Sequence, residues 1–74
     1  MIELNAPVQQ DKMIEFLDGS EIEGVTFTFK EKKGMKLFFE VNSEDVEEAA
    51  RTARNAIKAQ PWGSVLYFQA VGIK

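Results

Sequence analysis

The sequence contains no cysteine and no histidine. Without them the chain has no disulfides and no zinc-finger, iron–sulfur or haem–histidine site. A nucleophilic serine would need a lysine or a carboxylate as its base, and the positions of Ser20, Ser43 and Ser64 fit turns and a helix cap instead. We therefore predict that the chain is not an enzyme and holds no metal and no cofactor.

Glycine-rich phosphate loops and long hydrophobic runs are also missing. No Walker or dinucleotide-binding glycine pattern occurs, and the segment Asn5–Gln10, after the first expected strand, contains neither glycine nor arginine. The apolar stretch Val65–Phe68 is too short to span a bilayer. Met1–Asn5 alternates and includes an acid, unlike a signal peptide. We expect a cytoplasmic protein without a membrane segment.

What is present describes a small globular protein. Hydrophobic residues make up 45% of the 74 residues and charged residues 28%, which is ordinary for a folded domain. We expect a single α+β domain covering residues 1–74. A core of this size supplies only about 3–5 kcal/mol of net stability. Since disulfides and metals are excluded, association with another subunit is the remaining source of extra stability.

The charge is negative overall but unevenly distributed. The net charge of −3 argues against general affinity for nucleic acid, which depends on a basic surface. Acidic residues dominate positions 1–24, where Asp18, Glu21 and Glu23 lack the spacing of a calcium loop and indicate a polar connection. A possible basic patch lies at the expected hairpin tip and consists of Lys30, Lys32, Lys33 and Lys36.

The first half of the chain predicts a strand, a helix and a hairpin. Ile2 and Leu4 alternate with an acid, which is typical of a strand. A helix is expected at about residues 7–17, capped by Asn5, followed by a polar connection at 18–24. Alternating residues then predict a hairpin of strands 25–31 and 35–41 around a three-residue loop, Lys32-Lys33-Gly34.

The second half predicts one long helix and a last strand. Asn42 or Ser43 is a candidate cap, acids fill the first turns and basic residues the C-terminal half. Pro61 ends the helix, and residues 64–71 form a strand that is apolar on both faces. We predict a common core made by matched strand and helix periodicities: Phe27, Phe29, Leu37, Phe39, Ala50, Ala53 and Ile57.

This βαββαβ order resembles that of ferredoxin-like folds, although the resemblance lies in the element order alone. It implies a two-layer sandwich with a four-stranded antiparallel sheet in the order 4-1-3-2 and both helices on one face. An RNA-recognition motif is not matched, because the aromatic positions that it needs, in the parity of Met35, Leu37 and Phe39, are assigned to the core.

The open face of that sheet is the candidate interaction surface. Phe38, Val65 and Tyr67 are expected there, and no charge occurs from Ser64 to Ile73 to oppose pairing with another chain. Trp62 has two interpretations, a core residue or an anchor for a partner. The leading hypothesis is a non-catalytic binding or assembly module that self-associates through this face or the last strand, its partner being a protein or a second copy.

Two alternatives remain open. One is a small-ligand-binding regulatory domain, comparable in layout to amino-acid-sensing modules, although the first strand–helix junction lacks the glycine that a close backbone approach needs. The other is a nucleic-acid-associated protein that uses the basic hairpin tip. A ligand-induced melting shift would identify the first, and salt-dependent binding would identify the second.

Overall fold

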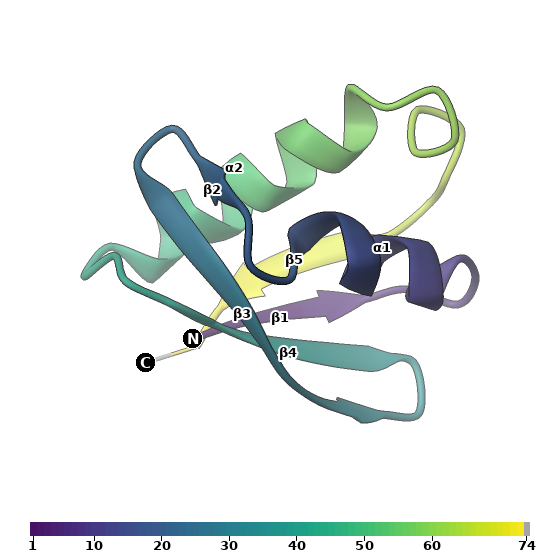
Figure 1. Cartoon of the computed structure of the whole chain (residues 1–74). Coiled ribbons are helices and arrows are strands. Elements are labelled where there is room, and N and C mark those ends of the chain that lie inside the picture. The colour runs from purple at the N-terminus through teal and green to yellow at the C-terminus, as the bar shows by residue number, and fades with distance from the viewer. Residues whose placement is uncertain (74) are drawn as a thin grey trace.

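A computed structural model describes residues 1–73 of the chain. The described residues form two helices and five strands (Figure 1). In chain order they are β1 (Ile2–Asn5), α1 (Gln10–Leu17), β2 (Glu21–Ile22), β3 (Val25–Lys33), β4 (Lys36–Val41), α2 (Val46–Lys58) and β5 (Gln69–Gly72).

The five strands form one antiparallel sheet in the order β2-β3-β4-β1-β5, which curls into a half-barrel (Figure 1). The outer strands β2 and β5 both contact α2, so the sheet bends around that helix. One source of the bend is a bulge in β3, where Phe29 lies opposite Phe39 but Glu31 lies opposite Phe38. The extra residue, Lys30, increases the local twist of the strand.

The prediction of a four-stranded ferredoxin-like sandwich is wrong. The segment 18–24, interpreted as a polar connection, contains the fifth strand, because Ile22 pairs with Val25. Glu23 and Gly24 make the turn between them with φ of 51° and 83°. Such turns usually carry Asn-Gly or Asp-Gly. A strand of two residues with a Glu-Gly turn therefore leaves almost no pattern in the sequence.

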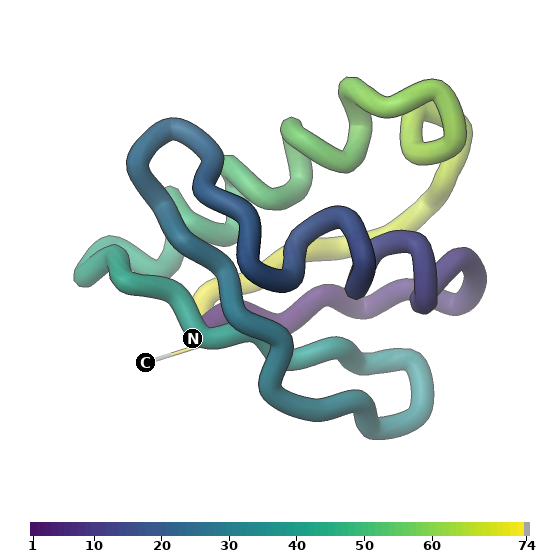
Figure 2. Tube along the Cα trace, in the orientation of Figure 1, coloured from purple at the N-terminus to yellow at the C-terminus, as the bar shows by residue number. Residues whose placement is uncertain are grey.

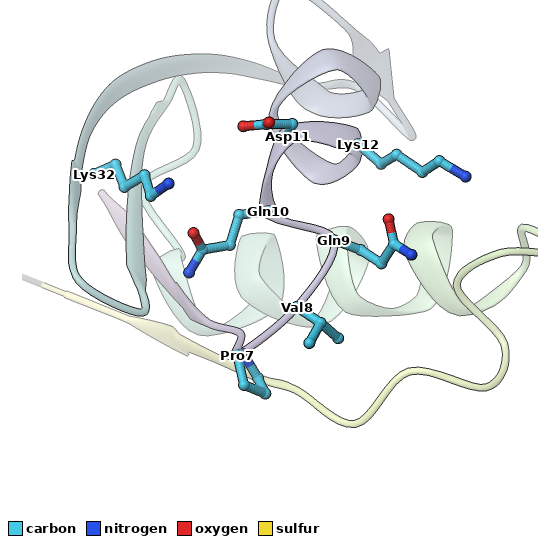
Figure 3. A pocket seen from close by; sticks show the side chains of 7 residues that line it. All are labelled: Pro7, Val8, Gln9, Gln10, Asp11, Lys12 and Lys32. Carbon is cyan, nitrogen blue, oxygen red and sulfur yellow. The ribbon is translucent and has the colours of Figure 1, made fainter.

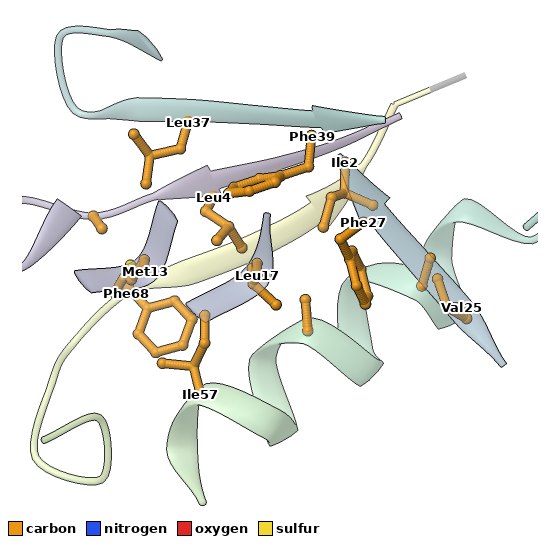
Figure 4. Packing of buried hydrophobic residues seen from close by; sticks show 14 residues of the cluster. Ile2, Leu4, Met13, Leu17, Val25, Phe27, Leu37, Phe39, Ile57 and Phe68 are labelled. Carbon is orange, nitrogen blue, oxygen red and sulfur yellow. The ribbon is translucent and has the colours of Figure 1, made fainter. Parts of the chain in front are cut away.

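The core fills the concave side of the sheet, and both helices pack there. Met13 and Leu17 from α1 and Ile57 from α2 meet the inward residues of the strands, Phe27 and Phe39 among them (Figure 4). The predicted core is confirmed for Phe27, Leu37, Phe39, Ala50, Ala53 and Ile57, which are all buried. Phe29 is only half-buried, and its ring packs edge-on against Phe39 with the centroids 5.5 Å apart.

Helix α1 begins later than predicted. Pairing with the hairpin continues one residue past Asn5, since the Ala6 amide donates to the Met35 carbonyl at 2.8 Å, and the chain then bends at Pro7 and Val8. Gln9 then turns the chain with φ of 59° and precedes the helix without a side-chain cap. The predicted helix start at residue 7 and the cap at Asn5 are therefore wrong, because Asn5 is paired in β1 and the left-handed backbone of Gln9 directly precedes the first helical residue, Gln10.

The hairpin turn is also shorter than predicted. Lys33 pairs with Lys36, so the turn consists of Gly34 and Met35, with Gly34 at φ 60°. Met35, expected to point toward the core, is instead 56% exposed at the tip.

Asp45, and neither Asn42 nor Ser43, caps helix α2. Its carboxylate accepts a hydrogen bond from the Glu48 amide at 3.1 Å. Ser43 supports the cap, because its hydroxyl accepts from the Asp45 amide at 3.2 Å. Asn42 instead accepts from the Thr26 amide at 2.9 Å and ties the end of β4 to β3.

Replacing Asp45 with alanine is expected to lower the free energy of unfolding by about 1 kcal/mol, the usual cost of a lost N-cap. Urea denaturation followed by circular dichroism measures it. Asp45→Asn is the matched control, because asparagine caps about as well as aspartate. An equal loss in both variants would show that charge rather than capping carries the effect.

The last strand starts five residues later than predicted, at Gln69. Residues 59–65 form turns and a bend. The Ser64 amide donates to the Gln60 carbonyl at 2.9 Å, and the Leu66 amide donates to the Gly63 carbonyl at 3.1 Å. The Lys58 ammonium donates to the Leu66 carbonyl. These local bonds hold the segment in a loop that returns from the end of α2 to the start of β5 (Figure 2).

Candidate interaction surface

Strand β5 is an edge strand, paired with β1 on one side only. The residues leading into it carry the two most exposed large apolar side chains of residues 1–73, and β5 itself carries a further exposed one. Val65 and Tyr67 are each 84% exposed, and Val71 is 46% exposed. No charged residue interrupts Ser64–Ile73. An uncharged edge strand with exposed apolar side chains is a natural site for docking another chain.

Phe38 is separated from Tyr67 on this surface. Phe38 lies half-buried in a cross-strand row with Glu31 of β3, Glu3 of β1 and Val71 of β5. The next row contains Lys36, Asn5 and Gln69, and Tyr67 lies beyond it. The predicted residues Phe38, Val65 and Tyr67 are thus not one apolar patch. Two acids flank Phe38, which makes the centre of the open face polar.

Tyr67 has different neighbours from those expected. It lines a shallow hollow of about 340 Å³ at the end of the sheet, together with Pro7 and Met35. Pro7 follows β1, Met35 forms the hairpin tip and Tyr67 precedes β5, so three connections meet at this end. The residues lining the hollow are Asn5, Pro7, Met35, Tyr67, Phe68 and Gln69. Met35 was not predicted at this surface, because the alternation of residues 35–41 places it in the strand instead of the turn.

A second groove, of about 370 Å³, follows the edge of β5 itself. Its lining consists of Tyr67 to Val71 on one side and Arg54 and Lys58 of α2 on the other. The Lys58 ammonium also lies 5.3 Å from the centre of the Phe68 ring. Within residues 1–73 neither Arg54 nor Lys58 forms a salt bridge. Neither residue was predicted at this surface, although their i, i+4 spacing places them on one side of the helix.

The four lysines of the possible basic patch do not form one cationic face. Lys30 pairs with Glu40 at 3.3 Å, and Lys33 lies 3.9 Å from Glu31. Lys33 and Lys36 lie opposite each other in the ladder. Lys32 is on the other side of the hairpin, where it faces the start of α1. The positive charge is therefore divided between two faces and partly neutralised.

The first strand–helix junction, where a regulatory ligand was considered, forms an open hollow of about 290 Å³ (Figure 3). Its two cations do not converge, since the Lys12 and Lys32 side chains lie at opposite ends of it (Figure 3). The Gln10 amide donates to the carbonyls of Ala6 at 2.8 Å and Gly34 at 3.1 Å. Its polar group therefore joins the junction to the hairpin tip.

Trp62 lies half-buried against the core. Its ring packs edge-on against Phe16 of α1 with the centroids 5.9 Å apart, and the Lys12 ammonium lies 5.9 Å from its centre. These contacts join the loop after α2 to helix α1, so the structure gives Trp62 a packing role.

Comparison with protein-family models, with curated proteins and with solved structures found no match. In the part of the chain that the structure describes, no group of three or more acidic side chains lies close enough together to hold a metal ion. No helix among residues 1–73 is both long enough and apolar enough to cross a membrane.

Proposed function

We propose that this protein is a non-catalytic binding or assembly module that self-associates through β5 and the residues leading into it. The observation that carries the proposal is the unpaired, uncharged edge of β5 with the exposed side chains of Tyr67 and Val71. The open face contributes less, because Glu3 and Glu31 flank Phe38. A domain of this size also gains stability from a partner subunit.

Tyr67→Lys tests this function. A charge at the docking edge opposes pairing with another chain, which is how natural edge strands avoid association. We expect the wild type to associate at high protein concentration and the variant to be monomeric, as measured by light scattering after size exclusion. The fold is expected to survive, since Tyr67 is 84% exposed.

Thr28→Lys is the control, because it adds the same charge at an exposed position of β3, remote from β5 in the strand order. It should associate like the wild type. A wild type that stays monomeric at high concentration would contradict the proposed function, and so would equal weakening in both variants.

A further inference from the structure

We infer that two copies of this chain pair isologously about a two-fold axis at Ala70, with β5 against β5 and Glu47 of each copy facing Arg54 of the other. The inference rests on the proposed self-association and specifies its geometry.

The free peptide groups of β5 are identified by its pairing with β1. The Ile73 amide donates to the Met1 carbonyl at 2.8 Å, and the Met1 amino group donates to the Ile73 carbonyl at 3.3 Å. In an antiparallel ladder, residues whose peptide groups bond to the neighbouring strand alternate with residues whose peptide groups point to the opposite edge. The peptide groups of Gln69 and Val71 therefore face β1, whereas the peptide N–H and C=O of Ala70 point toward the open edge.

A second β5 strand placed antiparallel about Ala70 uses this edge symmetrically. Ala70 then exchanges two hydrogen bonds with Ala70 of the second copy. In the same register Tyr67 lies opposite Ile73 of that copy, and Gln69 lies opposite Val71. All of these residues are uncharged, so no like charges face each other along the paired strands.

Helix α2 runs antiparallel to β5, as contacts at its two ends show, and the contact at Gly72 sets their relative heights. A Cβ on Gly72 would come within 2.7 Å of Val46, and Lys58 lies over the Phe68 ring at the other end. The midpoint between Glu47 and Arg54 lies about 7 Å from Val46, measured along the helix axis. Ala70 lies about 7 Å from Gly72, measured along the strand. The midpoint and Ala70 are therefore at the same height.

Because these two heights match, the pairing brings opposite charges of the two copies together. Glu47 and Arg54 are two helical turns apart, so they lie on nearly the same side of α2, and Arg54 lines the groove beside β5. A two-fold axis at Ala70 exchanges their heights, which brings each Glu47 level with Arg54 of the other copy. Opposite charges that face each other favour one register and disfavour others. A second copy thus supplies the carboxylate that Arg54 lacks within residues 1–73.

Charge reversal tests the geometry. Glu47→Arg places two arginines opposite each other at each pair, and Arg54→Glu places two glutamates there. We expect each variant alone to dimerise about tenfold or more weakly than the wild type. An equimolar mixture should recover the dimer, since the arginine introduced in one variant then faces the glutamate introduced in the other. Sedimentation equilibrium measures the dissociation constants, and circular dichroism of each variant verifies the fold.

Three results would overturn this geometry while leaving self-association in place. They are single variants that dimerise like the wild type, a mixture that recovers nothing although both variants are folded, and a wild type that assembles beyond a dimer. A monomeric wild type would overturn both the geometry and the proposed function. As a second measurement, the Ala70 amide should gain protection from hydrogen exchange as the protein concentration rises, whereas constant exchange at all concentrations would contradict pairing at this edge.

Discussion

Phe39→Ala is expected to lower the free energy of unfolding by about 3–5 kcal/mol, as truncation of a buried phenylalanine does. Phe39 is fully buried on β4 and contacts the ring of Phe29. Since a core of this size supplies about 3–5 kcal/mol in total, the variant should be largely unfolded at room temperature. Circular dichroism and urea denaturation, compared with the wild type, measure the loss.

Phe38→Ala is the matched control, because it removes the same side chain from the neighbouring position of the same strand. Phe38 is half-buried on the open face, in a row with Glu3 and Glu31. We expect a loss of about 1 kcal/mol. Similar losses in the two variants would show that the two faces of β4 are wrongly assigned.

Gly63→Ala is expected to be the second most damaging substitution. A Cβ at this position would lie 1.9 Å from the carbonyl oxygen of Ile57 and 2.8 Å from its carbonyl carbon. These are backbone atoms of helix α2, so they cannot move aside as a flexible side chain does. We expect a loss of about 3 kcal/mol, the upper end of the usual cost of overpacking, measured by chemical denaturation.

The displacement should also be visible in tryptophan fluorescence. Trp62 precedes Gly63 and packs against Phe16, so moving the loop should expose the indole and shift its emission to longer wavelength. Gly34→Ala serves as the comparison, because its Cβ would meet nothing within 4 Å and only its φ of 60° resists the change. That substitution should cost about 1 kcal/mol and leave the emission unchanged. A Gly63→Ala variant as stable as the wild type would refute the close contact.

The elements with strong periodicity were predictable. Val25 and Phe27 alternate with threonines in β3, and Ala50, Ala53 and Ile57 recur at helical spacing in α2, so the inward face of each followed from the sequence. The facing of Phe68 and Tyr67 was also predicted correctly, because buried and exposed residues still alternate as the chain approaches β5. Burial of one face is strongly determined by such patterns.

The ends of the elements were not predictable, because partners distant in the chain decide them. The Met35 carbonyl accepts from the Ala6 amide, so pairing with the hairpin continues past β1, and α1 begins only after the left-handed Gln9. The hydrogen bond from Lys58 to Leu66 and the packing of Gly63 on Ile57 shorten the last strand. Asn42 is taken by the Thr26 amide, which leaves Asp45 as the cap. In each case a contact absent from the local sequence competes with the local preference.

The candidate site, too, was predictable from the sequence only in part. The amino-acid sequence by itself determined that residues 64–73 are uncharged, that Phe38 and Tyr67 point away from the core and that no cysteine or histidine chemistry is available. Only the tertiary structure decided that Phe38 and Tyr67 lie in separate regions, that Met35 and Pro7 join Tyr67, and that Arg54 lines the edge of β5. The physical reason is that periodicity specifies the face on which a side chain lies, whereas its neighbours depend on strand order, register and the curl of the sheet, which are set by pairing between distant segments.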